Sequence, residues 1–123
     1  MLTEKFLEVI AKEGVVSIVS WGVDEPHIVN TWNSYLTITA DERILIPAAG
    51  MHSIESDFNA NKKVKITVGS KEVVGSFAQG AGFRIEGTGR FIDSGTEFDM
   101  MMAKFPFLSR VLEISISTLK QTL

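Results

Sequence analysis

The segment from residue 27 to residue 35 is rich in amide, hydroxyl and aromatic side chains. If it forms a strand, alternation places two sets of side chains on opposite faces: Ile28, Asn30, Trp32 and Ser34 on one, and Val29, Thr31, Asn33 and Tyr35 on the other. Each face then carries polar groups beside a large aromatic ring. Such groups need hydrogen-bond partners when buried, and a flat heterocycle with polar edges can supply them. The segment therefore predicts either a ligand platform in a central strand or a core tryptophan with hydrogen-bonded neighbours.

A second candidate for chemistry is the run of small residues from Pro47 to Gly50, which leads into Met51, His52 and Ser53. Small side chains let a ligand approach the backbone, and proline leaves nearby backbone groups unpaired. A helix beginning at Ser53 would offer free N–H groups and a hydroxyl, which suit a phosphate. The alternative is a plain strand–turn–helix connection capped by Ser53. Taken together, the two segments predict a ring on one side and a phosphate on the other.

The common catalytic constellations are missing from the sequence. It contains no cysteine and only two histidines, and it has neither a G-x-S-x-G elbow, nor a P-loop, nor a dinucleotide-binding glycine motif between a strand and a helix. His52 and Glu55 are three residues apart, a weak metal signal without further ligands, and His27 is interpreted as a loop residue after Pro26. We therefore predict no catalytic residue set and no metal site.

Length and composition indicate one folded domain spanning residues 1–123. The chain is 45% hydrophobic and has a formal net charge of −3, which excludes intrinsic disorder. Its basic residues are scattered, so we expect no nucleic-acid partner. No apolar run approaches the roughly 20 residues that span a bilayer, and no secretion signal is recognisable, so we expect no membrane partner and a cytoplasmic location.

Hydrophobic periodicity predicts a mainly β fold with short inserted helices. The expected strands cover residues 15–21, 27–39, 44–46, 64–68, 73–77, 83–92 and 111–117, with a loop at 79–82. The expected helices are a first one capped by Thr3 and closed by Gly14, a second over 53–61, and a third over 98–105 that follows a capping box at 94–97. The short connections favour an antiparallel sheet that curls into a barrel.

Several motifs resemble one known family. Glu-Gly-Val-Val at 13–16, Asn-Thr-Trp-Asn-Ser-Tyr-Leu at 30–36, Gly-Met-His at 50–52 and the closing Gln-Thr-Leu are similar to the small FMN-binding proteins of anaerobic bacteria. Those proteins belong to the flavin split-barrel group related to pyridoxamine phosphate oxidase, and the resemblance covers essentially the whole chain. It implies a six-stranded antiparallel split β-barrel of the FMN-binding type. It also implies a homodimer with one non-covalent FMN per subunit near the interface.

The resemblance further implies which residues bind the cofactor. Three residues would lie along the flavin and ribityl chain: Asn30, Thr31 and Trp32. Four would give backbone contacts to the ring edge: Ala48, Ala49, Gly50 and Met51. The helix start at Ser53 and Ile54 would receive the phosphate, and the partner subunit would contribute an aromatic near Phe107 and the C-terminal Leu123.

Two positions depart from the family pattern. The relatives carry Lys-Thr where this chain has Ser53 and Ile54, so a cationic phosphate contact is lost and binding would rely on Ser53, helix amides and a lysine such as Lys71. They also carry a tryptophan near the position of Phe107. Both changes are expected to alter cofactor affinity or redox tuning while leaving the ring platform in place.

Three functions are compatible with these observations. The first is an FMN-binding redox protein that transfers electrons with an unidentified partner, in which the cofactor supplies the reactive group. The second is a flavin-dependent oxidoreductase of the flavin reductase or pyridoxamine phosphate oxidase-like type, acting on a small substrate. The third is a barrel that has lost FMN and acts as a scaffold. Whether the protein is an enzyme is left open by the sequence.

Overall fold

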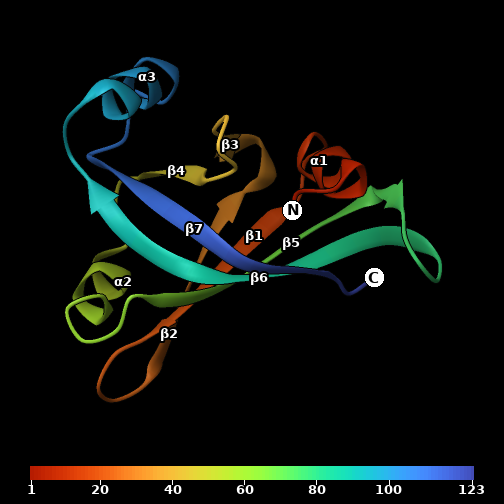
Figure 1. Cartoon of the computed structure of the whole chain (residues 1–123), viewed down its shortest axis with the longest axis horizontal. Coiled ribbons are helices and arrows are strands. Elements are labelled where there is room, and N and C mark those ends of the chain that lie inside the picture. The colour runs from red at the N-terminus through yellow and green to blue at the C-terminus, as the bar shows by residue number, and fades with distance from the viewer.

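The computed structural model describes residues 1–123 and contains three α-helices, one 3-10 turn and seven strands (Figure 1). In chain order the elements are α1 (Glu4–Ile10), β1 (Val15–Trp21), β2 (Pro26–Trp32), η1 (Asn33–Tyr35), β3 (Thr37–Ile38), β4 (Ile44–Ala48), α2 (His52–Asp57), β5 (Lys63–Val74), β6 (Gln79–Ile92), α3 (Thr96–Lys104) and β7 (Arg110–Gln121). None of the three helices has the length and apolar character needed to cross a membrane.

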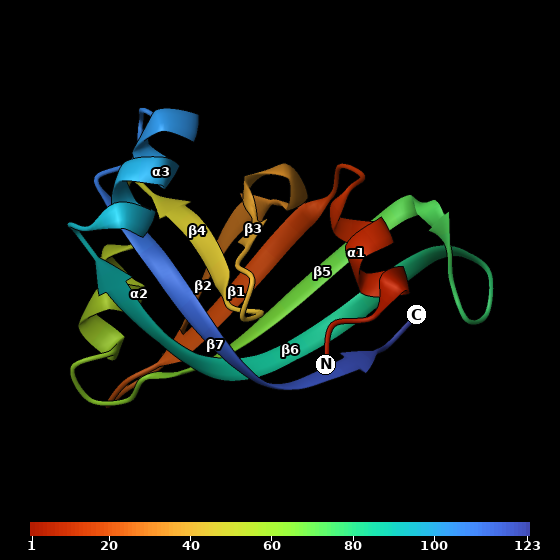
Figure 2. The same ribbon diagram turned by 45° about the horizontal axis from the view of Figure 1, so that its top comes forward.

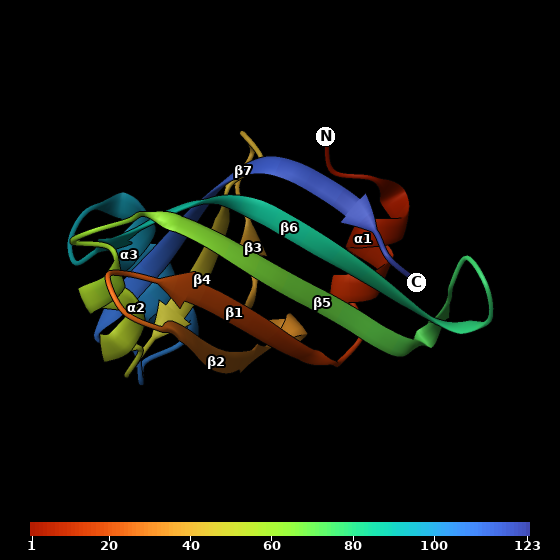
Figure 3. The same ribbon diagram turned by 90° about the horizontal axis from the view of Figure 1, so that it is seen from below.

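The seven strands form one sheet in the order β2-β1-β5-β6-β7-β4-β3, and every neighbouring pair is antiparallel. The sheet is strongly twisted and curls around its inner face, with α1 near one end and α2 and α3 near the other (Figures 2 and 3). The predicted mainly β, antiparallel fold class is confirmed. The sheet has seven strands rather than the six that the resemblance implied, and the shortest, β3, has only two residues.

A core of 17 buried residues lies inside the curl. Alternation along β1 and β5 supplies much of it, because every second residue of β1, and of β5 as far as Ser70, is buried. Helix α1 adds Phe6 and Val9, and the Phe6 ring meets that of Phe83 edge to face at 5.6 Å between centroids. Thr3 caps α1 as predicted, because its hydroxyl accepts from the Phe6 N–H at 3.1 Å. The helix ends at Ile10, so the prediction that Gly14 closes it is wrong.

The predicted long strand over 27–39 is interrupted because Asn33 turns into the core. Its side-chain Nδ2 lies 3.0 Å from the carbonyl oxygens of both Lys12 and Gly69, and its backbone N–H donates to the Gly14 carbonyl at 2.9 Å. A Cβ at Gly14 would lie 2.0 Å from the Gly69 carbonyl oxygen, so only glycine fits this junction. The chain therefore leaves β2 at Trp32 and resumes as β3 after the η1 turn.

The region between 63 and 92 is one long hairpin, which corrects two predictions. Residues 73–77 are not a separate strand, since β5 continues to Val74 with a register shift after Ser70. Residues 79–82 are not a loop, because β6 begins at Gln79. Gly82 pairs with Gly69 of β5 and also exchanges backbone hydrogen bonds with Leu123, so the sheet ladder includes a segment whose glycines are typical of loops.

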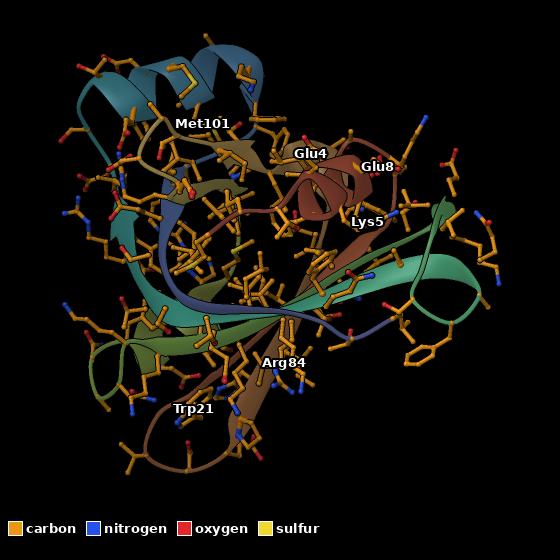
Figure 4. The ribbon with its side chains drawn as sticks, turned by 45° about the vertical axis from the view of Figure 1, so that its right-hand side comes forward. Glu4, Lys5, Glu8, Trp21, Arg84 and Met101 are labelled. Atoms are coloured by element: carbon orange, nitrogen blue, oxygen red, sulfur yellow. The ribbon has the colours of Figure 1, made fainter.

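Two predicted helix caps are also wrong. Helix α2 begins at His52 after Met51, which adopts the left-handed conformation at φ 64°, so Ser53 lies inside the helix and does not cap it. Helix α3 begins at Thr96 after Gly95 at φ 104°, with no side-chain cap from Ser94. The Met101 side chain points from α3 toward the sheet and is buried with Leu45, Leu108 and Val111 in a second, smaller core (Figure 4).

Candidate functional site

Strand β2 is an edge strand rather than the central strand predicted, and its two faces have different environments. On the inner face Thr31 is buried and His27 and Val29 are half-buried. On the outer face Ile28 is 70% exposed and Trp32 is 46% exposed. The interpretation of Trp32 as a core tryptophan is therefore wrong. Its ring instead belongs to an open apolar surface on the outer side of the sheet.

The outer surface continues from β2 onto β1. Val15 is opposite Trp32 in the register of the two strands and is also exposed, and Ser17 donates a hydrogen bond to the Asn30 side chain at 3.1 Å. Farther along the sheet, Trp21 and Arg84 also point to this outer side, away from α1 (Figure 4). The β2 end of the sheet therefore offers an aromatic and an aliphatic surface with one amide, a composition that suits one face of a flat ring.

The small-residue segment after β4 is a firmly attached turn with free donors. The Ser109 hydroxyl lies 3.2 and 3.3 Å from the carbonyl oxygens of Ala48 and Ala49, and Arg110 Nη2 donates to the Gly50 carbonyl at 2.6 Å. The N–H groups of Ala49 and Gly50 have no acceptor within the chain. A Cβ at Gly50 would meet no atom within 4 Å, so the space in front of the turn is open. The turn can therefore donate hydrogen bonds to a ligand edge.

The two segments singled out from the sequence meet at one pocket of about 220 Å³. Its lining residues come from β2 and from the start of α2: His27, Ile28, Val29, Met51, His52, Ser53 and Ile54. The left-handed turn at Met51 brings the start of α2 against β2. The predicted proximity of the polar β2 segment and the Ser53 segment is thus a feature of the fold.

A hydrogen-bonded group of three side chains lies beside this pocket and was missed in the sequence. Asp57 Oδ2 accepts from the Ser20 hydroxyl at 2.7 Å and lies 2.8 Å from His27 Nδ1. Ser20 is opposite His27 in the β1–β2 register, and Asp57 approaches from α2, which packs on both strands. A Cβ at Gly22 would lie 2.8 Å from Asp57 Oδ1, so a glycine there gives the carboxylate room.

The contact between Asp57 and His27 favours the charged form of both side chains. The hydrogen bonds from Ser20 and then from His27 hold the pKa of Asp57 below its usual range. The hydrogen bond to Asp57, together with the nearby carboxylates of Asp24 and Glu25, raises the pKa of His27 despite its partial burial. A carboxylate accepts hydrogen bonds and does not donate them, so Nδ1 carries a proton and Nε2 faces away from Asp57.

The interpretation of His27 as a loop residue is wrong, because it is the second residue of β2. The sequence does contain a signal for this position: His27, Val29 and Thr31 are two residues apart, so in a strand they share one face, which here is the inner one. Asp57 gave no comparable signal, since its contact with His27 depends on how α2 docks against the sheet.

Phe107 and Leu123 lie outside the β2–α2 pocket. Phe107 is half-exposed and packs against Tyr35 and Phe105, with ring centroids 5.5 and 6.0 Å away. Leu123 lies beside Gly82 and lines a different pocket of about 300 Å³ that also includes Lys71. Within one chain, therefore, Lys71, the lysine expected to help bind a phosphate, lies beside Leu123 and not beside Ser53.

A second buried carboxylate, Glu113 of β7, belongs to a different arrangement. Arg90 Nε donates to it at 2.6 Å, and Arg43 Nη1 donates to its other oxygen. Arg43 also pairs with Glu97 at the start of α3 at 2.6 Å and with Asp41 at 3.0 Å. The arginine hydrogen bonds lower the pKa of Glu113, and the bonds from Arg43 and Thr39 lower that of Asp41 to about 2. This network joins α3 to β7 and to the residue before β4.

Comparisons with known proteins agree with this architecture. Residues 2–122 match the family model described as pyridoxamine 5'-phosphate oxidase. The chain is 42% identical, over the full length of both sequences, to a protein named FMN-binding protein from Nitratidesulfovibrio vulgaris strain Miyazaki F. Among solved structures, HupZ of Group A Streptococcus superposes with a TM-score of 0.81 at 13% identity, covering 99% of this chain and 94% of that one. An FMN-binding protein from Syntrophomonas wolfei superposes with a TM-score of 0.69 at 14% identity, covering 88% and 76%.

Proposed function

The chain belongs to the pyridoxamine 5'-phosphate oxidase family, and from that premise we propose that it binds one FMN non-covalently per subunit and serves as a redox protein that transfers electrons. The observation that carries the proposal is the meeting of the β2 segment and the Met51–Ile54 segment at one pocket, on the strand that also bears the exposed Trp32. A full-length relative at 42% identity is named an FMN-binding protein, which supports the same cofactor.

The residues at this site fit the three chemically distinct parts of FMN. Trp32 offers an exposed aromatic surface for the ring system. The free N–H groups of Ala49 and Gly50 can donate to acceptors at the ring edge. The pocket beside Ser53 contains polar side chains suited to a phosphate. We propose that Asn30 and Thr31 contact the flavin and ribityl chain, and that Ala48 and Met51 join Ala49 and Gly50 in backbone contacts to the ring edge.

When bound, FMN supplies an electron-accepting ring, which the polypeptide itself lacks. The chain's residues then bind the ring, orient it and exclude water from one of its faces. A dedicated acid, base or nucleophile is not needed for electron transfer. This accounts for a site built from backbone donors, one tryptophan and hydroxyl groups.

We also propose that the FMN site lies near a homodimer interface, in a cytoplasmic protein. The support is the exposed apolar surface on edge strand β2 together with the partial exposure of Phe107 and Leu123. These two residues lie outside the pocket of their own chain, as expected if they contact the flavin of a partner subunit.

The first test is the visible absorbance of the purified protein. We expect flavin bands that disappear on denaturation, with FMN released into solution. Colourless protein that also fails to take up added FMN would contradict the proposal. If flavin is bound, bleaching by a panel of reductants and small substrates separates an electron carrier from an oxidoreductase.

A matched pair of tryptophan variants locates the ring. Trp32→Ala is expected to weaken FMN binding by about three- to tenfold, because aromatic stacking contributes roughly 0.5–1.5 kcal/mol. Trp21→Ala is the control, since Trp21 is on the same side of the sheet but lines a separate pocket with Lys63 and Lys65. Fluorescence titration with FMN measures both. Equal losses in the two variants would place the ring elsewhere.

A further inference from the structure

The pocket between β2 and α2 contains neither lysine nor arginine among its lining residues. Its only groups able to carry positive charge are the imidazoles of His27 and His52. A phosphate monoester carries close to two negative charges at neutral pH. Its strongest hydrogen bonds are those from positively charged donors, and a site without a cation cannot make them. One of the two histidines is therefore the natural candidate for the missing charge.

The two histidines differ in how firmly they are held. His27 has 31% of its side chain exposed, and its Nδ1 is fixed by the buried Asp57 carboxylate, which Ser20 orients in turn. His52 is 80% exposed, and its nearest ionic partner is Glu55 at 4.0 Å, beyond hydrogen-bond distance. Only His27 presents a ring nitrogen whose direction is set by the fold.

We propose that His27, oriented by Asp57 and Ser20, binds the phosphate group of FMN through Nε2 and replaces a lysine or arginine at this site. The inference rests on the proposed function and adds to it the identity of the charged phosphate ligand. Nε2 has no hydrogen bond in the chain, and it lies 4.0 Å from Glu25 Oε1, beyond hydrogen-bond distance and on a side chain that is 77% exposed. A charge-assisted hydrogen bond from Nε2, together with the Ser53 hydroxyl, then fixes the phosphate end of the cofactor.

The arrangement makes FMN affinity depend on pH. The groups that face His27 are Asp57 from α2 and Asp24 and Glu25 from the turn before β2, all acidic, and their effect is to raise its pKa. The imidazolium therefore persists above the ordinary value of 6.5. As the pH rises through the pKa of His27, Nε2 loses its proton and can no longer donate. FMN binding is expected to weaken over that interval, whereas binding of riboflavin, which lacks the phosphate, is expected to stay constant.

The test compares dissociation constants of FMN and riboflavin for the wild type and for His27→Gln. The variant is expected to bind FMN roughly ten- to a hundredfold more weakly, the range for a lost hydrogen bond to a charged group, with riboflavin affinity retained. His52→Gln is the matched comparison, with an expected loss of about threefold or less, because an exposed charge contributes little. An unchanged FMN affinity in His27→Gln, or an equal loss for riboflavin, would overturn the inference.

A second variant keeps the test decisive if His27→Gln folds poorly. Asp57→Asn retains the size of the side chain but removes the charge that raises the pKa of His27, so the pH at which FMN affinity falls should move downward. An unmoved pH profile would overturn the inference. Wild-type protein that binds neither FMN nor riboflavin overturns the proposed function as well, whereas FMN binding that is independent of His27 overturns the phosphate assignment alone.

Discussion

The molecule contains two buried carboxylates, Asp57 and Glu113, whose surroundings have opposite consequences. Asp57 is hydrogen-bonded to a hydroxyl and to an imidazole beside a pocket. Glu113 is hydrogen-bonded to two guanidinium groups, those of Arg43 and Arg90, which stay charged at every physiological pH. The imidazole that pairs with Asp57 has a pKa raised from its ordinary value by that contact and can change its charge, whereas the guanidinium groups that pair with Glu113 stay charged.

This difference assigns the two carboxylates to different tasks. The Glu113 network joins α3, β7 and the residue before β4 through fixed charges, so its contribution is to the fold. Asp57 joins α2 to the first residues of β2 and sets the charge of a side chain that faces a pocket. We therefore expect changes around Glu113 to alter stability with little effect on flavin binding, and changes around the pocket to do the reverse.

The largest expected effect is on stability, from Glu113→Gln. The substitution removes a buried charge shared by two arginines and should lower the free energy of unfolding by about 3 kcal/mol, near the low end for a broken buried ion pair because Arg90 is largely exposed. Glu97→Gln is the control, with an expected cost of about 1 kcal/mol or less at a more exposed pair. Urea unfolding at neutral pH measures both. Equal costs would show that Glu113 is not the centre of the network.

The next effect is on ligand binding, from the double change Thr31→Val with Ser53→Ala. Both side chains lose a hydroxyl while the backbone is unaltered, so FMN affinity should fall about tenfold, as expected for two lost hydrogen bonds. The free energy of unfolding should change by only about 1 kcal/mol, because neither residue belongs to the Asn33 junction or the main core. Unchanged affinity would mean that the flavin site is misplaced.

The smallest effect is the pH dependence of stability, and it separates the two carboxylates most cleanly. The folded-state pKa of Asp57 is lowered, so its contribution is complete above 3.8 and is lost as the pH falls through the folded value. The folded-state pKa of His27 is raised, so its contribution is complete below 6.5 and is lost as the pH rises through the folded value. The difference in stability between wild type and Asp57→Asn should be largest between about pH 4 and pH 6.5.

The same comparison for Glu113 gives a different profile. Its pKa is lowered by arginines that do not titrate in this range, so the difference between wild type and Glu113→Gln should be constant from about pH 5 to pH 9. Urea midpoints at pH 5, 7 and 9 for the three proteins test this prediction. Parallel profiles for the two variants would remove the distinction between the carboxylates.

The fold class could be predicted from the sequence because short runs of β-type residues recur along it, and β1 and the first part of β5 alternate regularly between buried and more exposed residues. The positions at which the structure departs from that pattern could not be predicted. Asn33 follows the seven residues of β2, yet it ends the strand because its side-chain amide donates hydrogen bonds to the carbonyl oxygens of Lys12 and Gly69. Gly82 suggested a loop, yet it pairs with Gly69 and with Leu123, contacts that lie far away in the sequence.

The candidate site shows the same limit. The polar β2 segment and the Ser53 segment were recognisable because unusual residue types cluster there. The His27–Asp57 contact spans 30 residues and the Arg43–Glu113 contact spans 70, and neither has a local signature. Alternation also separated the two faces of β2 correctly, but it could not show that the strand lies at the edge of the sheet, which is why Trp32 is exposed.

The most direct test of the central claim is a crystal structure of the protein with FMN at neutral pH. We predict electron density for the ring against Trp32 and the turn at Ala49 and Gly50, with the phosphate within hydrogen-bond distance of His27 Nε2 and the Ser53 hydroxyl. A flavin bound in the pocket beside Leu123 alone, or a phosphate remote from the start of α2, would contradict the account.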